Sequence, residues 1–436
     1  MSQMQRIAVV GAGISGLASA WLLSRQYDVT LFEASNYLGG HAHTVDVTLE
    51  GCTHPVDTGF LVFNEHTYPN LMALFDHLGV GSVQTEMSFS VSLETPDLEW
   101  AGSSLNTVFG QKRNLLRPSF WSMLSDILRF NRESHAWLAT HAHEPRSLED
   151  FLQAGGYSHA FADWYLLPMA AAIWSCPPQK MRDMPLETFI RFCQNHGLLQ
   201  VFDRPMWRTV RGGARTYVRK MAHYLDDIRL SCPVRSIQRD QHSLWLEHGN
   251  VREHFDQVVV ACHSPQALAL LGATASAGQR AVLQAIRYQP NRVVLHTDST
   301  LLPRDGKLWS AWNYFAGPGE PGVRPVGVSY LMNPLQALPF KTPVVLTLNP
   351  ARAPDPAKVI AEFDYAQPIL DAAALAAQQQ LAAVQGQNGI WLAGAWSRYG
   401  FHEDGLKSAL QIANRLGVQA PWQNRQPVLP FETVAV

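Results

Sequence analysis

A glycine-rich turn that follows a short apolar run near the start of the chain constrains the fold more than any other feature. The run Ile7–Val10 is predicted to be a buried parallel strand, and the segment Gly11–Gly16 after it opens a predicted helix over residues 17–25. The three glycines of the segment permit a tight turn, the approach of the backbone to a diphosphate, and close packing of the helix on the strand. The pattern therefore predicts a Rossmann-type strand–helix–strand unit that binds a dinucleotide.

An acidic residue closes the second strand of this predicted unit. Residues 28–32 form the strand, and Glu33 follows it, 17 positions after Gly16. A carboxylate at this place accepts both hydroxyls of a ribose and repels a 2′-phosphate. A glycine-rich turn without a ligand is the alternative, which the complete strand–turn–helix context disfavours. The fingerprint alone does not separate NAD from FAD.

Composition narrows the class of protein further. Hydrophobic residues make up 47% of the 436 residues and charged residues only 16%, and 13 Trp and 19 Phe indicate an aromatic core or a large apolar pocket. A net charge of −2 provides no basic field for nucleic acid. The five cysteines are dispersed without a zinc-type spacing, so we expect no metal site and a reducing compartment. No signal-peptide pattern is recognisable, so we expect a cytoplasmic protein.

Strand–helix patterns at both ends of the chain, with different material between them, predict an interrupted α/β (mixed α+β) fold. Helical spacing runs over 118–138 and, broken by prolines, over 145–200, and strand patterns return over 228–262 and 292–348. We expect a Rossmann-type nucleotide-binding domain built from discontinuous segments, and a substrate domain with a sheet and a helical insertion. The nucleotide-binding domain would comprise residues 1–80, 205–285 and 386–420, the substrate domain residues 81–204 and 286–385, and a C-terminal tail residues 421–436.

The segments after Glu33 resemble a known group of proteins. Leu38–Thr44 holds a second glycine pair, and Val56–Gly59 follows a little later. In these segments the chain resembles the flavoprotein superfamily of flavin amine oxidases, phytoene desaturases and protoporphyrinogen oxidases, which implies FAD. His41 stands where that superfamily usually has an Arg that helps to neutralise the diphosphate, so this task falls to His41 or to backbone N–H groups.

Further segments extend the resemblance over most of the chain. Arg211–Ala214 is similar to an internal Gly-Gly turn of the superfamily, and Val234 falls where its backbone contacts adenine. Leu392–Trp396 and Asp404–Leu406 are similar to the closing motif, whose helix points its N-terminus at the flavin N1–C2=O edge and stabilises the anionic reduced flavin. No cysteine lies near this motif, so the resemblance implies non-covalent FAD. Ala395 stands where the superfamily has an acidic ribityl ligand, which leaves that contact open.

The fingerprint and the resemblance together give a set of expected cofactor contacts. These are Gly11, Gly13, Ile14, Ser15, Gly16, Glu33, Ala34, Gly39, Gly40, His41, Asp57, Thr58, Gly59, Val234, Gly394, Ala395, Asp404, Gly405 and Leu406. No second fingerprint marks a separate nicotinamide domain, so we expect oxygen, a quinone or a partner protein as the electron acceptor.

Three segments resemble one group within the superfamily most closely. Gly59–Asn64, Trp312–Tyr314 and Gly400–Gly405 are similar to bacterial predicted FAD-dependent amine oxidoreductases that are often encoded beside cyclopropane fatty acyl phospholipid synthases. This resemblance implies removal of a hydride from a C–H bond of an apolar, fatty-acyl or lipid-like substrate, by oxidation or desaturation.

A basic–aromatic stretch agrees with a lipid substrate. Lys112, Arg113 and Arg117 precede Phe120 and Trp121, a combination suited to peripheral contact with a membrane surface. A solvated helix start above an ordinary core is the other interpretation of the same residues.

Three alternative functions stay open. The first is amine oxidation: the superfamily's amine oxidases place an aromatic ring where this chain has His402, and often a Lys where the strand 292–296 begins with Arg292. The second is isomerisation, in which hydride leaves one carbon and returns at another. The third is flavin binding without turnover.

His402 and Arg292 are therefore the expected catalytic candidates. An imidazole beside a flavin can take up a proton near neutral pH. A hydrogen bond to the backbone or to Glu403 is the alternative role for His402. Trp312, Tyr399 and Trp396 are the expected lining of the substrate pocket, although an aromatic residue is more often part of a core.

Overall fold

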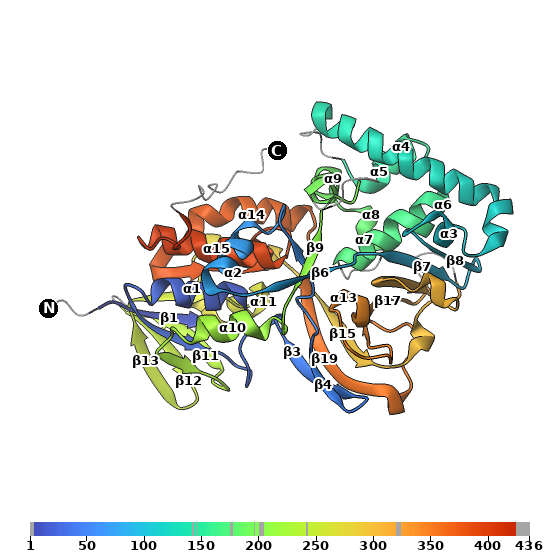
Figure 1. Ribbon diagram of the computed structural model, residues 1–436. Helices are drawn as coiled ribbons and strands as arrows, with labels where there is room; N and C mark the ends of the chain where they lie inside the picture. The colour runs from blue at the N-terminus through green and yellow to red at the C-terminus, as the bar shows by residue number, and fades with distance from the viewer. Residues whose placement is uncertain are drawn as a thin grey trace.

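Two sheets that lie side by side organise the chain (Figure 1). The computed structural model describes residues 4–141, 144, 146–174, 178–195, 197–199, 205–240, 243–319 and 324–423. One sheet is parallel and has helices on both faces, and the other is mainly antiparallel and has a group of helices above one end. The mixed α+β architecture predicted from the sequence is confirmed.

The parallel sheet is assembled from three distant parts of the chain. Its five strands run in the order β10-β2-β1-β14-β20. Their bounds are Arg6–Val10 for β1, Asp28–Phe32 for β2, Asp227–Arg229 for β10, Gln257–Val260 for β14 and Ile390–Leu392 for β20. Every neighbouring pair is parallel, and Ile7 stands between Val29 on one side and Gln257 on the other. The predicted Rossmann-type domain built from discontinuous segments is confirmed.

Alternate residues of the strands belong to two separate cores, because successive side chains of a strand point to opposite faces of a sheet. Ile7 and Val9 pack on the face that carries four helices, and Ala8 and Val10 pack on the opposite face. The four helices of the first face are α1 (Ile14–Leu23), α2 (Pro69–Leu78), α10 (Arg215–Ala222) and α15 (His402–Arg415).

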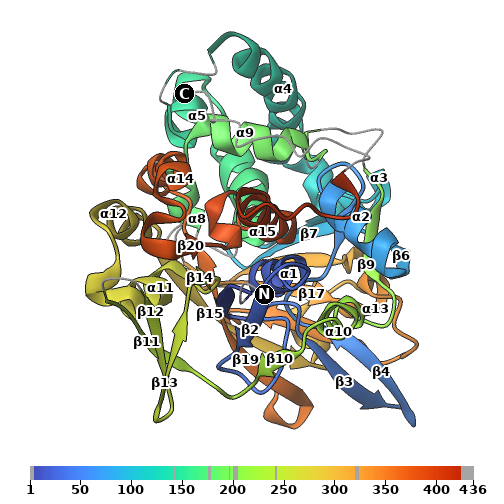
Figure 2. The same cartoon turned by 90° about the vertical axis from the view of Figure 1, so that its left-hand side faces the viewer.

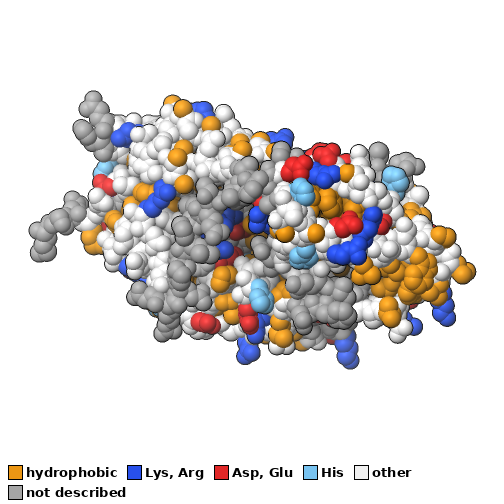
Figure 3. Space-filling view, turned by 90° about the horizontal axis from the view of Figure 1, so that it is seen from above, with side chains coloured by type: hydrophobic (Ala, Val, Ile, Leu, Met, Phe, Trp, Pro, Cys, Tyr) orange, Lys and Arg blue, Asp and Glu red, His pale blue; other side chains and the backbone are white. Residues whose placement is uncertain are grey.

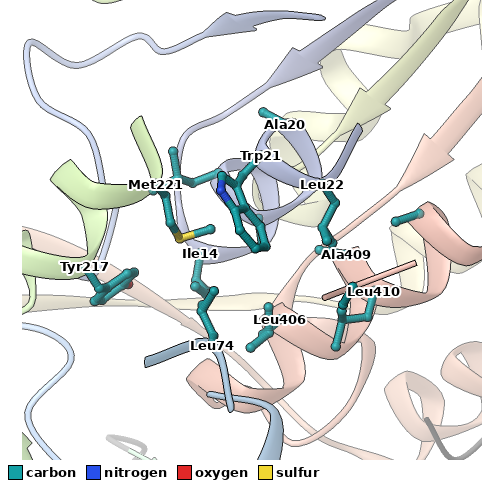
Figure 4. Packing of buried hydrophobic residues seen from close by; sticks show 14 of the residues in the cluster. Ile14, Ala20, Trp21, Leu22, Leu74, Tyr217, Met221, Leu406, Ala409 and Leu410 are labelled. Atoms are coloured by element: carbon teal, nitrogen blue, oxygen red, sulfur yellow. The ribbon is translucent and has the colours of Figure 1, made fainter. Parts of the chain in front are cut away.

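The first and the last helix of the fold pack against each other on this face. α1 and α15 lie side by side in Figure 2. Figure 4 shows Leu22 of α1 next to Ala409 of α15, with Tyr217 of α10 and Leu74 of α2 at the side of the same cluster. Burial of this shared apolar face fixes the position of α15 relative to the start of α1.

The opposite face of the parallel sheet is covered by three helices and a small antiparallel sheet. These are α11 (Ser264–Leu271), α12 (Ala277–Ala285), α14 (Ala372–Val384), β11 (Val234–Arg239), β12 (Leu244–His248) and β13 (Val251–Phe255). Leu381 and Val384 of α14 pack in one cluster with Val258 and Val260 of β14. The domain limits stay predictions, and this packing favours moving the limit predicted at residue 385 to a point before α14.

The second sheet has seven strands in the order β19-β15-β18-β17-β16-β7-β8. Their bounds are Phe89–Leu93 for β7, Leu98–Ala101 for β8, Tyr288–His296 for β15, Trp312–Ala316 for β16, Val326–Leu331 for β17, Val345–Leu348 for β18 and Val359–Pro368 for β19. β16 and β7 are parallel, and the other neighbours are antiparallel. This sheet joins residues that precede the helical insertion to residues far behind it.

The helical insertion stands above the end of the second sheet (Figure 1). Its helices are α3 (Leu105–Val108), α4 (Pro118–His141), α5 (Leu148–Ala154), α6 (His159–Phe161), α7 (Leu167–Trp174), α8 (Pro178–Arg182) and α9 (Leu186–Asn195). The 3-10 helix η1 (Lys112–Leu116) precedes α4, and a π-helical turn over Ala162–Leu166 joins α6 to α7. The helix predicted over 118–138 is thus confirmed as α4, and the insertion has its own apolar cluster around Phe130.

The remaining elements are short, and some of them lie between the two sheets. These are β3 (Thr44–Leu49), β4 (Cys52–Asp57), β5 (Phe63–Asn64), β6 (Ser82–Thr85), β9 (Trp207–Val210), α13 (Met332–Leu335) and the 3-10 helices Gly272–Thr274, Ser299–Leu301, Gly306–Leu308, Pro356–Lys358, Gln387–Gly389 and Ala395–Ser397. β6 and β5 both pair with β9, so one small sheet spans the domain limit predicted at residue 80.

Two kinds of feature are absent from the described residues. No helix among them combines the length and the apolar character needed to cross a bilayer. No group of three or more His, Cys, Asp or Glu side chains in this part of the chain is arranged to hold a metal ion.

Candidate cofactor-binding and active site

The fingerprint turn forms at the carboxyl end of β1, as the sequence predicts. Gly11 has a φ of 99°, and its N–H donates to the carbonyl of Phe32 at 2.8 Å. A Cβ atom on Gly16 would lie 1.8 Å from the carbonyl oxygen of Gly11, so the helix approaches the turn more closely than any other residue type allows. Gly13 differs, because no described atom lies within 4 Å of the place its Cβ would take. The turn is therefore compact behind Gly16 and open in front of Gly13.

The Glu33 carboxylate faces this turn from the end of β2. One oxygen accepts from the backbone N–H of Ala12 at 2.7 Å, and the other accepts from the N–H of Ser35 at 2.8 Å. The backbone N–H of Cys232 donates to the Glu33 carbonyl at 2.9 Å, which brings the segment before Val234 to the same edge. Exposed Ala34 lies between Glu33 and Ser35. The carboxylate is thus fixed in orientation at the place predicted for a ribose.

The second glycine pair is laid against the first fingerprint turn. Gly39 forms an isolated parallel bridge with Gly13, and its N–H donates to the carbonyl of Ala12 at 2.9 Å. A Cβ atom on Gly40 would stand 3.0 Å from the Cα of Gly13. These contacts place His41, the next residue, beside the open side of the turn.

His41 has a buried ring nitrogen that lacks a hydrogen-bond partner in the described part of the chain, as expected of a residue that contacts a ligand. The residue as a whole is partly exposed, but its Nε2 atom is shielded from solvent and has no hydrogen-bond partner among the described residues. Burial lowers the pKa of His41. His263 at the N-cap of α11 lies 5.9 Å away, ring centre to ring centre, and burial together with His41 lowers the pKa of His263 to about 4. Both rings are therefore neutral at neutral pH when no anion is near.

These features fit a dinucleotide. The first-turn N–H groups of α1 have free space in front of Gly13, and an orphaned imidazole nitrogen stands beside that space. A buried polar atom without a hydrogen-bond partner costs free energy. When the neutral His41 ring carries its hydrogen on Nε2, that N–H can donate to a diphosphate oxygen. Sequence reasoning identified His41 but did not find His263, whose signal is its place directly behind β14 at the same sheet edge.

Asp57 has a different role from that of a free ligand. Both carboxylate oxygens accept from the backbone N–H of Ala214, at 2.9 and 3.1 Å, and one also accepts from the Thr44 hydroxyl at 2.5 Å. Burial raises the pKa of Asp57 to about 6 despite these donors. The residue thus ties β4 to the start of α10, and the predicted contact between Asp57 and the cofactor stays a prediction.

Thr58 and Gly59 shape the chain around His41. A Cβ atom on Gly59 would lie 2.2 Å from the His41 carbonyl oxygen. The Thr58 hydroxyl lies 2.6 Å from the hydroxyl of Tyr365, which also stands 3.0 Å from Nδ1 of His43. Tyr365 belongs to β19, so this polar group connects the second sheet to the cofactor side of the fold. The sequence offered no local signal for Tyr365.

The closing strand β20 leads into the last helix through Gly394 and Ala395. The N–H of Gly394 donates to the Ser408 hydroxyl of α15 at 3.0 Å. Trp396 is a core residue: it is 1% exposed, packs in the cluster behind the parallel sheet, and donates its indole N–H to the Cys262 carbonyl at 3.2 Å. The structure does not bring Trp396 together with Tyr399 and Trp312, and its place in the pocket lining stays a prediction.

The start of α15 meets the start of α1. A Cβ atom on Gly405 would lie 2.7 Å from Cγ2 of Ile14 and 2.8 Å from the hydroxyl oxygen of Ser15. Leu406 is fully buried in the cluster that α1 and α15 share. The Asp404 carboxylate accepts from the backbone N–H of Phe401 at 3.0 Å, and burial raises its pKa. Two helix N-termini thus converge at one place, where both favour negative charge.

His402 lies at the first position of α15, enclosed by two aromatic rings. Its ring stacks on Phe60 with a centroid distance of 3.9 Å and an interplanar angle of 11°, and its Nε2 lies 2.5 Å from the hydroxyl of Tyr217. Burial, with a smaller contribution from His41, lowers the pKa of His402 to about 3. The observed partner is neither the backbone nor Glu403, but a tyrosine 185 positions away that sequence reasoning did not find.

Glu403, next in the chain, closes the N-terminus of α2. Its carboxylate accepts from the backbone N–H and the side-chain amide of Asn70, at 3.1 and 2.7 Å, and from the N–H of Leu71 at 2.9 Å. Lys407 stands 3.6 Å from one oxygen. Because the first turn of a helix leaves N–H groups unpaired, a carboxylate from another helix is an effective cap.

Aromatic side chains of the helical insertion reach the segment before α15. Phe192 stacks on Phe401 at 5.0 Å and lies 6.2 Å from Tyr399, and Trp174 is 4.5 Å from Phe192. Trp312 packs across the strands against Tyr330 at 5.1 Å, and its indole N–H is shielded without a hydrogen-bond partner in the described part of the chain. Tyr399 and Trp312 therefore stay in the predicted pocket lining.

Arg292 lies away from this site. It forms a two-pronged pair with Glu362 of β19, and the Arg292 side chain is 51% exposed. Its neighbour Asn291 is buried and stands opposite Tyr365, on the face of the sheet that meets the cofactor side. Arg292 points to the other face because strand residues alternate, so the structure does not bring it to this site, and its catalytic role stays a prediction.

Comparisons with known proteins agree with this geometry. The family model described as flavin containing amine oxidoreductase matches residues 14–351. A carotenoid phi-ring synthase of Chlorobaculum tepidum is 38% identical over 188 residues, which cover 38% of this chain and 28% of the relative. The chain aligns with less than a third of the length of this relative and of three other curated relatives that it matches.

Solved structures share the fold over nearly the whole chain. A CLA-producing fatty acid isomerase from P. acnes superposes with a TM-score of 0.67 at 14% identity, covering 96% of this chain and 100% of the other. A cyclohexylamine oxidase from Brevibacterium oxydans IH-35A superposes with a TM-score of 0.65 at 17% identity, covering 95% and 100%. At these identities the likeness establishes the fold.

Proposed function

The chain belongs to the family of flavin-containing amine oxidoreductases, and from this premise we propose that it removes a hydride from a C–H bond of an apolar, fatty-acyl or other lipid-like substrate. It is an FAD-dependent oxidoreductase. The proposal concerns the substrate class and the residues that serve it. Oxygen, a quinone or a partner protein would take the electrons.

Bound FAD supplies the two-electron acceptor for the hydride. The residues that would hold it are those whose contacts are incomplete or prearranged: the open turn at Gly13, the shielded nitrogen of His41 and the fixed carboxylate of Glu33. The start of α15 adds the positive end of a second helix dipole, against which negative charge is stabilised.

The observation that supports an apolar substrate is the aromatic wall beside α15. Phe192, Tyr399 and Phe401 lie in or against the apolar cluster of the helical insertion. Burial, and then the nearby carboxylates of Asp404 and Glu187, raise the pKa of the Tyr399 hydroxyl. Both carboxylates already accept hydrogen bonds within the protein: Asp404 from a backbone N–H, and Glu187 from Arg191 at 2.7 Å. A substrate amine would need a carboxylate free to pair with its ammonium group, so this wall favours an uncharged chain.

His402 would act by position and not as an acid. Its pKa of about 3 keeps the ring neutral near pH 7, when it can accept a hydrogen bond from Tyr217 and present its flat face to Phe60. A neutral imidazole is a poor acid near pH 7, whereas it can fix the orientation of the first turn of α15. His402→Ala is expected to leave FAD bound and to slow reduction of the flavin by substrate.

Anaerobic reduction of the purified yellow protein tests the substrate class. Bleaching of the flavin absorbance is followed after mixing with an unsaturated fatty acyl phospholipid, and separately with an alkyl amine of matched chain length. Faster bleaching by the acyl lipid supports the proposal, and bleaching by the amine alone would replace it with amine oxidation. Double-bond migration without consumption of an electron acceptor would instead establish isomerisation.

Arg292→Ala is the matched control for His402→Ala. Arg292 is exposed on the opposite face of the second sheet, so its removal should leave flavin reduction unchanged. Equal slowing by both substitutions would mean that His402 has no specific role. Gly13→Ala tests the cofactor site itself: the protein should fold, because the added methyl meets no described atom, yet retain much less FAD.

A further inference from the structure

Large hydrophobic side chains are exposed together at one end of the helical insertion. Of the eleven such side chains that the described residues expose, five lie within residues 105–128. They are Leu105 (78% exposed), Leu115 (47%), Leu116 (87%), Trp121 (50%) and Leu128 (63%), and we call them the apolar face. Figure 3 shows hydrophobic side chains gathered at the right-hand end of the molecule, where Figure 1 places α3 and the start of α4. Single exposed leucines are ordinary, but such a cluster marks an interaction surface.

Helix α4 is hydrophobic on two sides, and only one of them is needed by the core. Phe120, Met123 and Phe130 are buried against the second sheet and the insertion. Trp121 and Leu128, seven positions apart and therefore on one side of the helix, point to solvent. The sequence pattern joined Phe120 and Trp121 in one stretch, whereas the structure separates them into a core residue and a surface residue.

The apolar face is held in shape by the protein. The Trp121 indole N–H donates to the carbonyl of Leu115 at 3.0 Å, and the ring of Phe109 lies 5.2 Å from that of Trp121. η1 and the first turns of α4 are thereby joined into one surface. A tryptophan anchored in this way presents its apolar edge outward without losing its hydrogen bond.

Positive charge surrounds this face. Residues 102–128 contain three cations, Lys112, Arg113 and Arg117, and one acid, Asp126, which is buried and paired with Arg129 at 2.9 Å, although the chain as a whole has a net charge of −2. Asp97 lies beside the face, but it is shared by Arg113 and Arg304, and these two arginines lower its pKa to about 2. The local surface is therefore basic within a slightly acidic protein.

We propose that the apolar face docks on the surface of a lipid bilayer that contains anionic headgroups. Leu116, Trp121 and Leu128 would enter the boundary between headgroups and acyl chains, and Lys112 and Arg117 would pair with the anionic lipids. A second copy of the chain is a poor occupant, because a symmetric contact would bring the same cations together without acidic partners. The proposal goes beyond the proposed function and does not depend on it.

Flotation with vesicles tests the proposal on the full-length holoprotein. The protein is mixed with phosphatidylcholine vesicles, with or without phosphatidylglycerol, and the fraction that floats is measured at low and high salt. We expect binding to the anionic vesicles only, weakened by salt. Lys112→Glu with Arg117→Glu should reduce the partition coefficient by more than about tenfold, since each cation near such a surface contributes roughly fivefold.

Leu116→Ser with Trp121→Ser removes the apolar contribution and should lower the partition coefficient by about tenfold or more. The matched control is Val251→Ser with Ile360→Ser, which changes two exposed apolar residues elsewhere and should bind vesicles as the unchanged protein does. Equal binding by the Leu116/Trp121 variant, equal binding to neutral vesicles, or no binding to any vesicle would overturn the proposal. So would a dimer in light scattering that the Leu116/Trp121 variant abolishes while vesicle binding stays absent.

Discussion

The first turn of α15 and the first half of α4 depart from the usual burial pattern in opposite directions. α15 buries three polar side chains in succession: His402 is 9% exposed, Glu403 2% and Asp404 6%. α4 leaves Trp121 half exposed and Leu128 63% exposed. Globular proteins ordinarily place such residues the other way round.

The two departures differ in how completely the side chains are partnered. Each buried polar group of α15 has a donor or acceptor within the protein, from Tyr217, Asn70 or the backbone of Phe401. The exposed residues of α4 have no apolar cover on their outer side. The first arrangement stabilises a site that is already assembled, and the second leaves a surface that a partner can stabilise.

The largest expected effect concerns Glu403. Glu403→Ala would leave the N–H groups of Asn70 and Leu71 and one side-chain amide without their acceptor, and each buried unpaired donor costs about 1–3 kcal/mol. We expect the free energy of unfolding to fall by about 3 kcal/mol or more, measured by urea denaturation.

Glu403→Gln is the matched control, because its amide oxygen still accepts from one donor in the same space. It should cost clearly less than the alanine substitution. If both variants were as stable as the unchanged protein, the buried carboxylate would not be the cap of α2. The buried polar groups of α15 would then not stabilise the fold in the way that the comparison with α4 assumes.

The next effect concerns the contact between the two helix starts. Gly405→Ala adds a methyl 2.7 Å from Cγ2 of Ile14, which forces α15 away from α1. We expect a loss of about 1–3 kcal/mol in stability and weaker retention of FAD, because both helix N-termini shift. Gly306→Ala is the control, since no described atom lies within 4 Å of its Cβ position. Unchanged FAD retention in Gly405→Ala would show that the approach of the helices does not matter to the cofactor.

A smaller effect should appear in the pH dependence of stability. The pKa of His402 is about 3 in the folded protein against 6.5 for an ordinary histidine, so the unfolded state binds a proton first as the pH falls. The contribution of neutral, buried His402 to the free energy of unfolding is fully present above about pH 6.5. It is lost progressively toward pH 3, at up to about 1.4 kcal/mol per pH unit. His402→Gln, which keeps an acceptor for Tyr217, should flatten the slope of unfolding free energy between about pH 6 and pH 4 by up to one proton.

Asp57 should change the pH dependence of the free energy of unfolding in the direction opposite to that of His402. Burial raises its pKa to about 6, so its contribution improves as the pH falls through that value. Asp57→Asn should therefore steepen the acid loss of stability where His402→Gln makes it shallower. Equal slopes in the His402 variant and the unchanged protein would mean that His402 titrates normally in the fold.

Local sequence patterns were sufficient to predict the strand–turn–helix unit at the start of the chain. The strand before Gly11, the glycine spacing and Glu33 follow one another within a single unit, so their geometry is set by short-range rules. The fold of the parallel sheet followed from the same patterns repeated at distant places.

Roles that depend on long-range contacts could not be predicted. Tyr217 reaches His402 across 185 positions, and Tyr365 reaches Thr58 across 307. The orientation of Arg292 could not be predicted either, because a shift of one residue along a strand changes the face to which a side chain points. The burial of Trp396 could not be predicted, because no periodic pattern determines the conformation of the turn after Gly394.

The smallest effect on stability is expected for the exposed face of α4. Leu128→Ser removes a side chain that is 63% exposed, so the free energy of unfolding should change by no more than about 0.5 kcal/mol. Met123→Ala on the inner face of the same helix should cost about 2–5 kcal/mol, because its side chain is fully buried. If Leu128→Ser cost as much as Met123→Ala, Leu128 would serve the core, and the two helices would no longer differ in the way that the docking proposal requires.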